Sequence, residues 1–82
     1  MYKTTVKIEG MMCGMCEAHI QEALRKAYPS AKKVKASRSK REASFLSEYT
    51  PDPEKLRLVI ADTGYICLGI ETVPYKKKGL SG

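Results

Sequence analysis

The stretch that decides the fold is Gly10-Met11-Met12-Cys13-Gly14-Met15-Cys16, which joins a strand-like segment to a helix-like one. Before it, Thr4, Val6 and Ile8 alternate with polar residues, the period of two that is typical of a half-buried strand. After it, apolar residues recur at helical spacing, at Ile20, Ala23, Leu24 and Ala27. The pattern therefore predicts that Cys16 lies in the first turn of a helix and Cys13 in the loop before it.

The two cysteines have a chemistry that follows from this placement. At the start of a helix, unpaired backbone N–H groups and the positive end of the dipole stabilise a thiolate. Cys13 lies on the adjoining loop, where its sulfur can come alongside that of Cys16. Two such sulfurs on a surface loop make either a clamp for a soft metal ion or a redox pair, and this pattern alone leaves both open.

The rest of the chain predicts a βαββαβ order. Strands are expected over residues 2–9, around 34–36, over 43–49 and over 65–73, with a polar turn at 37–41. The first helix is expected over 15–28, because Pro29 cannot continue it. The second starts with Asp52 as its N-cap and Pro53 in its first turn, and stops at Gly64. This order predicts an α+β, ferredoxin-like sandwich: a four-stranded antiparallel sheet with two helices on one face.

Length and composition set the broad class. The 82 residues suit one small domain, expected over 1–74, followed by a basic C-terminal tail over 75–82. The net charge of +6 comes with few aromatics among the basic runs, so we expect a solvated face or a surface for an acidic protein rather than nucleic acid. No signal peptide or membrane-spanning stretch is apparent, and three cysteines do not suit a disulfide framework. We therefore expect a cytoplasmic protein without membrane insertion.

A Gly-Met-x-Cys-x-x-Cys loop between the first strand and first helix of a βαββαβ unit resembles the heavy-metal-associated domain family. That family includes small copper chaperones and the N-terminal modules of metal-transporting P-type ATPases, and the resemblance covers about residues 3–73. It implies that Cys13 and Cys16 hold Cu(I), or another soft ion such as Zn²⁺, and pass it to a partner by thiolate exchange. The implied partner is a metal-transporting P-type ATPase or another metal-binding protein, and two loops sharing one ion would make a metal-bridged homodimer. A metal sensor or storage module would use the same residues.

The resemblance also implies supporting roles around the loop. Met11 matches the family methionine that tucks under the loop and fixes its shape. Met12 stands where relatives more often have a polar residue, and we interpret it, like Met15, as an exposed methionine facing a partner; a drier and softer metal rim is the alternative. Tyr65, after Gly64, matches the aromatic or lysine side chain that relatives place beside the metal loop. It would cover the site without touching the metal.

Two further candidate ligands remain. Cys67 lies two residues after Tyr65 on a strand, where relatives usually have a core aliphatic residue, so we expect a small buried side chain and keep a third ligand as the alternative. Ile66, Leu68 and Ile70 form the stronger apolar set, which would make an exposed strip if it lined the open face of the sheet. His19, three residues after Cys16, is expected to face solvent rather than the metal.

The rival class is a thiol–disulfide oxidoreductase. Such an enzyme would have a thioredoxin-like architecture, usually with an aromatic residue before the first cysteine and a proline between the two. Here Met12 precedes Cys13, and Gly14 and Met15 intervene. The sequence also lacks a Ser-His-Asp set, a carboxylate pair suited to catalysis and a glycine-rich phosphate loop. We therefore expect a metal-binding protein rather than an enzyme.

Overall fold

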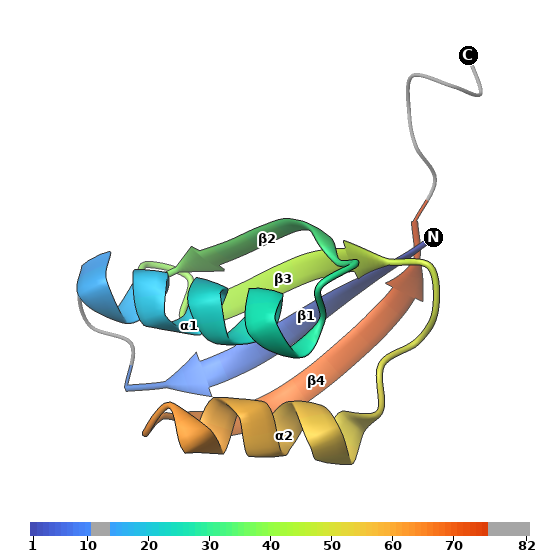
Figure 1. Ribbon diagram of the computed structural model, residues 1–82. Coiled ribbons are helices and arrows are strands. Elements are labelled where there is room, and N and C mark those ends of the chain that lie inside the picture. The colour runs from blue at the N-terminus through green and yellow to red at the C-terminus, as the bar shows by residue number, and fades with distance from the viewer. Residues whose placement is uncertain (11–13, 76–82) are drawn as a thin grey trace.

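The computed structural model, described here for residues 1–10 and 14–75, has six elements in the order βαββαβ (Figure 1). They are β1 (Tyr2–Glu9), α1 (Gly14–Ala27), β2 (Lys32–Ser37), β3 (Glu42–Ser47), α2 (Pro53–Asp62) and β4 (Ile66–Pro74). The strands form one antiparallel sheet in the order β2-β3-β1-β4. Both helices cover the same face of the sheet (Figure 1). The predicted ferredoxin-like sandwich is confirmed.

The ends of the elements follow from local signals in the sequence. Asp52 has extended backbone and its side chain accepts a hydrogen bond from the Glu54 N–H at 3.1 Å, so it caps α2 as predicted. The strand expected over 43–49 is shorter, because β3 ends at Ser47. There the Ser47 hydroxyl donates to the Tyr49 carbonyl at 2.6 Å, a local bond of the kind that competes with a sheet ladder.

The core lies between the helices and the covered face of the sheet. Its fully buried apolar side chains come from both layers: Val6, Ile8, Ile20, Leu24, Phe45, Leu56 and Ile60. Each such side chain contributes about 1.5–3 kcal/mol by leaving water. The Tyr28 ring stacks on Phe45 with 5.2 Å between ring centroids and closes one side of this core. In the part of the chain that the structure describes, no helix is long and apolar enough to cross a membrane.

A β-bulge in β4 changes the expected alternation of side chains. Ile8 pairs with Cys67 and Lys7 pairs with Gly69, so Leu68 is an extra residue without a partner in the ladder. As a result, Cys67 and Ile70 both pack against the core although they are three residues apart. Ile66 and Leu68 are 57% and 61% exposed. The apolar strip expected from Ile66, Leu68 and Ile70 therefore lacks Ile70, and that part of the prediction is wrong.

We predict that Tyr28→Phe leaves the free energy of unfolding unchanged or raises it by up to about 1 kcal/mol at neutral pH. The Tyr28 hydroxyl is buried with no hydrogen-bond partner among the described residues, and the substitution keeps the stacked ring. Burial, helped by Tyr49 and Asp52, raises the pKa of Tyr28 in the folded state. The unfolded chain therefore ionises first, and the wild type should lose stability relative to Tyr28→Phe above about pH 10.

Urea unfolding of both proteins at neutral and alkaline pH tests this. Phe45→Leu serves as the control, because it removes the stacking partner of Tyr28 and should destabilise the protein by about 1 kcal/mol. A loss of more than about 1 kcal/mol in Tyr28→Phe would show that the hydroxyl makes a stabilising hydrogen bond.

Candidate metal centre

Cys16 lies in the first turn of α1, as its spacing predicted. The helix begins at Gly14, so Cys16 is its third residue, and its side chain is half-buried against the core. The orphan N–H groups and the dipole of this first turn favour a thiolate. The other expected loop residues, Met11, Met12 and Cys13, lie outside the described residues.

Two connections reach the end of the sheet where β1 ends and α1 begins. They are the β2–β3 turn and the α2–β4 connection, both at the left in Figure 1. The topology requires this, because β3 and β4 both run antiparallel to β1 and so start where β1 ends. Residues far apart in the sequence are thereby gathered around the first turn of α1.

Tyr65 comes to this end on the α2–β4 connection and packs against Gly10. A Cβ placed on Gly10 would lie 3.2 Å from Cδ1 of Tyr65, closer than an ordinary van der Waals contact. Gly10 also has a φ of 102°, a backbone conformation that side chains disfavour. Both the close contact with Tyr65 and the positive φ therefore favour glycine at residue 10, which precedes the cysteine loop. The half-buried Tyr65 ring lies beside the entry to that loop and packs on the core as well.

The β2–β3 turn places Arg38 beside the first turn of α1, a position that the sequence pattern did not predict. The Glu17 carboxylate, in the first turn of α1, accepts the Arg38 backbone N–H at 2.7 Å and ties the turn to the helix. The Arg38 guanidinium comes within 3.9 Å of where a Cβ of Gly14 would stand. The local sequence of residues 37–41 predicts only a polar turn. The topology was the signal available, since a βαββαβ order places this turn at the same end as the cysteine loop.

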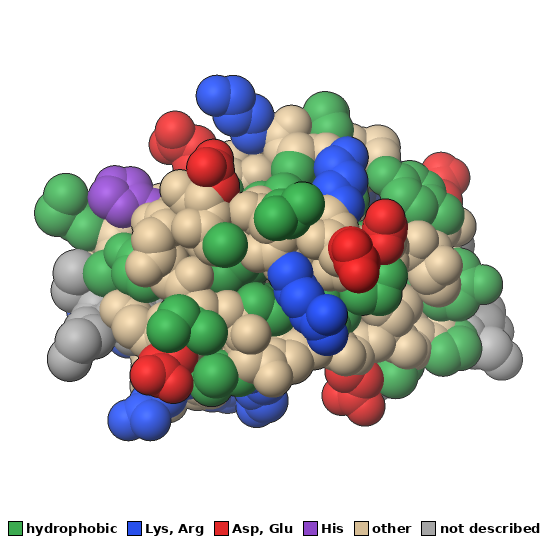
Figure 2. Space-filling view, turned by 90° about the horizontal axis from the view of Figure 1, so that it is seen from below, with side chains coloured by type: hydrophobic (Ala, Val, Ile, Leu, Met, Phe, Trp, Pro, Cys, Tyr) green, Lys and Arg blue, Asp and Glu red, His purple; other side chains and the backbone are tan. Residues whose placement is uncertain are grey.

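The other candidate ligands among the described residues are His19 and Cys67. Within residues 1–10 and 14–75, no group of three or more His, Cys, Asp and Glu side chains could hold a metal ion. His19 is exposed on α1 and is the single purple side chain at the surface in Figure 2. Cys67 is half-buried on the core side, with its Sγ directed to the Gly69 carbonyl at 3.9 Å. Met15 is 70% exposed on the first turn of α1.

Comparison with known proteins finds a similar segment in one longer protein and the same fold in several solved structures. No family model matches the chain. Mercuric reductase of Shigella flexneri is 34% identical over 62 residues, which are 76% of this chain but 11% of the reductase. Oxidized MerP from Ralstonia metallidurans CH34 has a TM-score of 0.67 and 25% identity, covering 82% of this chain and 94% of MerP. A copper binding domain from HMA7, a P-type ATPase, has a TM-score of 0.69 and 21% identity, covering 90% and 96%. The fold of this chain is that of heavy-metal-associated domains.

We predict that Gly10→Ala destabilises the protein by more than about 1 kcal/mol, because it adds backbone strain and pushes on Tyr65. Two other glycines are matched controls. Gly64 has a φ of 94° and open space around it, so Gly64→Ala should cost only the strain. Gly69 has neither a positive φ nor an atom within 4 Å of an added Cβ, so Gly69→Ala should change the free energy of unfolding by less than about 0.5 kcal/mol.

Chemical denaturation of the three variants measures both effects. The difference between Gly10→Ala and Gly64→Ala reports the packing of Tyr65 on the loop entry. Equal stability of Gly10→Ala and Gly69→Ala would show that neither the backbone conformation nor the Tyr65 contact constrains this residue.

Proposed function

We propose that this protein carries a soft heavy-metal ion, held by the thiolates of Cys13 and Cys16 and passed to a partner by ligand exchange. The observation that carries the proposal is the position of Cys16 in the first turn of α1, at the end of the sheet that the β2–β3 turn and the α2–β4 connection also reach. The fold shared with MerP and with a copper binding domain supports it. The identity to a segment of mercuric reductase supports it as well.

The chemistry of two thiolates suits carriage rather than storage in a closed site. Thiolates are soft donors that accept Cu(I), Zn²⁺, Cd²⁺ and Hg²⁺. Two sulfurs leave a bound ion open to a further ligand, so that a cysteine of the partner can join before the first ligand leaves. A structural zinc site would instead have four ligands closed around the ion. The ion is thus a cargo, and a sensor or storage role for the same residues is the alternative.

The charge around the first turn of α1 favours Cu(I) as the cargo. Two thiolates and Cu(I) carry a net charge of −1, whereas two thiolates and a divalent ion are neutral. The Arg38 guanidinium beside Gly14, together with the positive end of the helix dipole, stabilises the anionic complex and does little for the neutral one. An exposed charge near a bound ion contributes on the order of 1 kcal/mol.

The neighbouring residues take supporting roles in this proposal. Tyr65 covers the loop from its place on Gly10, and Met11 fixes the shape of the loop. Met15, exposed on the first turn, and Met12 face the partner. Cys67 acts as a core residue. The recipient would be a metal-transporting P-type ATPase in the cytoplasm, and two copies sharing one ion is the alternative arrangement.

The ferredoxin-like fold separates this proposal from the oxidoreductase alternative. A Cys-x-x-Cys enzyme of that class has a thioredoxin-like architecture, and the observed strand order and helix placement differ from it. We therefore assign no catalytic step to Cys13 and Cys16.

Titration with Cu(I) against a competing chelator tests the ligands. We expect one tightly bound ion per chain and an affinity at least about 100-fold lower in Cys13→Ser and in Cys16→Ser, since each removes one of two thiolates. Cys67→Ser is the matched control and should stay within about threefold of wild type, because Cys67 packs on the core. An equal loss in Cys67→Ser would indicate three sulfur ligands and a sensor or storage role. The absence of tight binding in the wild type would refute metal carriage.

Arg38→Gln tests the preference for a monovalent ion. The substitution should weaken Cu(I) binding by about 3- to 10-fold and change Zn²⁺ binding less than twofold, as the charge argument requires. The tie to Glu17 uses the backbone N–H of Arg38, so the turn keeps its place. Arg57→Gln removes the same charge from an exposed position on α2 and should change neither affinity. Equal weakening of both ions by Arg38→Gln would contradict the charge argument.

A further inference from the structure

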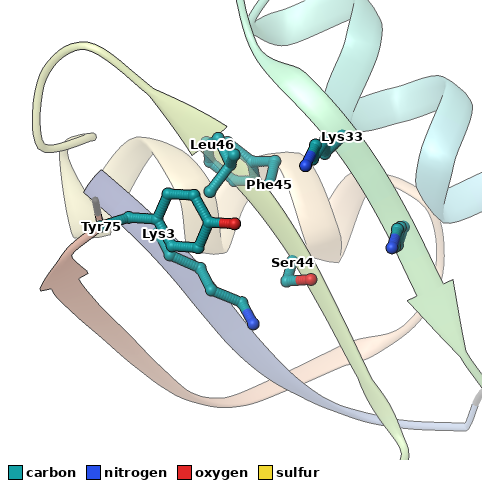
Figure 3. Close-up of a pocket in the computed structure, with 7 residues that line it drawn as sticks. Lys3, Lys33, Ser44, Phe45, Leu46 and Tyr75 are labelled. Atoms are coloured by element: carbon teal, nitrogen blue, oxygen red, sulfur yellow. The ribbon is translucent and has the colours of Figure 1, made fainter. Parts of the chain in front are cut away.

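The open face of the sheet carries a cavity of about 120 Å³ near the start of β1, away from the candidate metal centre (Figure 3). All four strand regions contribute to it. Its lining consists of Lys3 on β1, Lys33 and Lys35 on β2, Ser44, Phe45 and Leu46 on β3, and Tyr75 after β4. Side chains with an ammonium or hydroxyl group outnumber the purely apolar ones in this lining.

The strand register explains why these residues meet. Lys3 pairs with Leu46, and Ser44 pairs with Lys35, so their side chains share the face opposite the helices. Between these pairs, β2 has two residues where β3 has one, which makes a bulge at Lys33. Lys33 adopts a φ of 52°, a left-handed conformation that is costly for a residue with a side chain. The bulge brings Lys33 and Lys35 to the same cavity, and strained residues of this kind concentrate at functional sites.

The charge of the cavity is unbalanced. Its lining has three lysines and no carboxylate. Among the described residues, the one salt bridge joins Lys7 and Glu42. None of the three cavity lysines therefore forms a salt bridge with a described residue. The Tyr75 and Ser44 hydroxyls point into the same space (Figure 3). Tyr75 is held there by its N–H, which donates to the Met1 carbonyl at 2.8 Å.

We propose that this cavity binds a phosphate group. Three ammonium groups attract a phosphate dianion, and two hydroxyls can donate to its oxygens. A volume of about 120 Å³ has room for one tetrahedral oxyanion. The phosphate comes either from a free phosphate in solution or from the headgroup of an anionic lipid. Since no residue of the candidate metal centre lines the cavity, this site does not depend on the proposed metal function.

Lys33→Gly is the decisive variant, because it removes the charge and relieves the left-handed backbone at once. Arg41→Gly is its matched control: Arg41 has a φ of 55°, carries the same charge and does not line the cavity. Both variants should raise the urea midpoint of unfolding. Only Lys33→Gly should weaken phosphate binding, by at least about threefold, which separates a binding role from a structural one.

The measurement is an amide NMR titration of the full chain with inorganic phosphate at constant ionic strength. We expect saturable shifts at Lys3, Lys35, Ser44 and Tyr75, unchanged in Arg41→Gly. Cosedimentation with phosphatidic acid vesicles, against phosphatidylcholine alone, then identifies the source. If the wild type binds the vesicles and Lys33→Gly does not, the source is a lipid headgroup. If the wild type binds inorganic phosphate but not the vesicles, the source is free phosphate. Shifts that do not saturate, equal weakening in Arg41→Gly, or vesicle binding without phosphate binding would overturn the proposal.

Discussion

The structure depends on the pairing of β1 with antiparallel strands on both of its edges. Because β3 and β4 run opposite to β1, the end of β1, the β2–β3 turn and the α2–β4 connection share one end of the sheet. This constraint brings Tyr65 onto Gly10 and Arg38 beside the start of α1. The chemistry of the candidate metal centre is therefore assembled by backbone hydrogen bonds far from it, and a change in β1 pairing would disperse these residues.

The first turn of α1 packs on the core on one side and lies at the candidate metal centre on the other. On one side, Cys16 packs on the core that Ile20 and Leu24 share with the sheet. On the other, the turn offers its orphan N–H groups, and Glu17 holds Arg38 near them. A metal ion released by ligand exchange needs an accessible site whose ligands keep their place. In our proposal the core holds Cys16, and the loop leaves the ion open to a partner.

Periodicity and end signals made the fold predictable. The alternation in β1, the helical spacing after Cys16 and the Asp52-Pro53 pair predicted the element order and most boundaries. The bulges were not predictable, because an extra residue such as Leu68 reverses the facing of all that follow it. Cys67 and Ile70 therefore lie on the same face of the sheet, whereas strict alternation would place them on opposite faces. The place of Arg38 follows from the βαββαβ order and not from the local pattern of residues 37–41, and the cavity that we propose binds phosphate depends on the bulge at Lys33.

The central claim is that the sulfurs of Cys13 and Cys16, and no others, hold the ion. X-ray absorption at the copper edge, on protein loaded with one equivalent of Cu(I), counts and identifies the ligands directly. The account predicts two sulfur ligands and the same spectrum for Cys67→Ser. A third sulfur that disappears in Cys67→Ser, or a nitrogen ligand that disappears in His19→Gln, would contradict it.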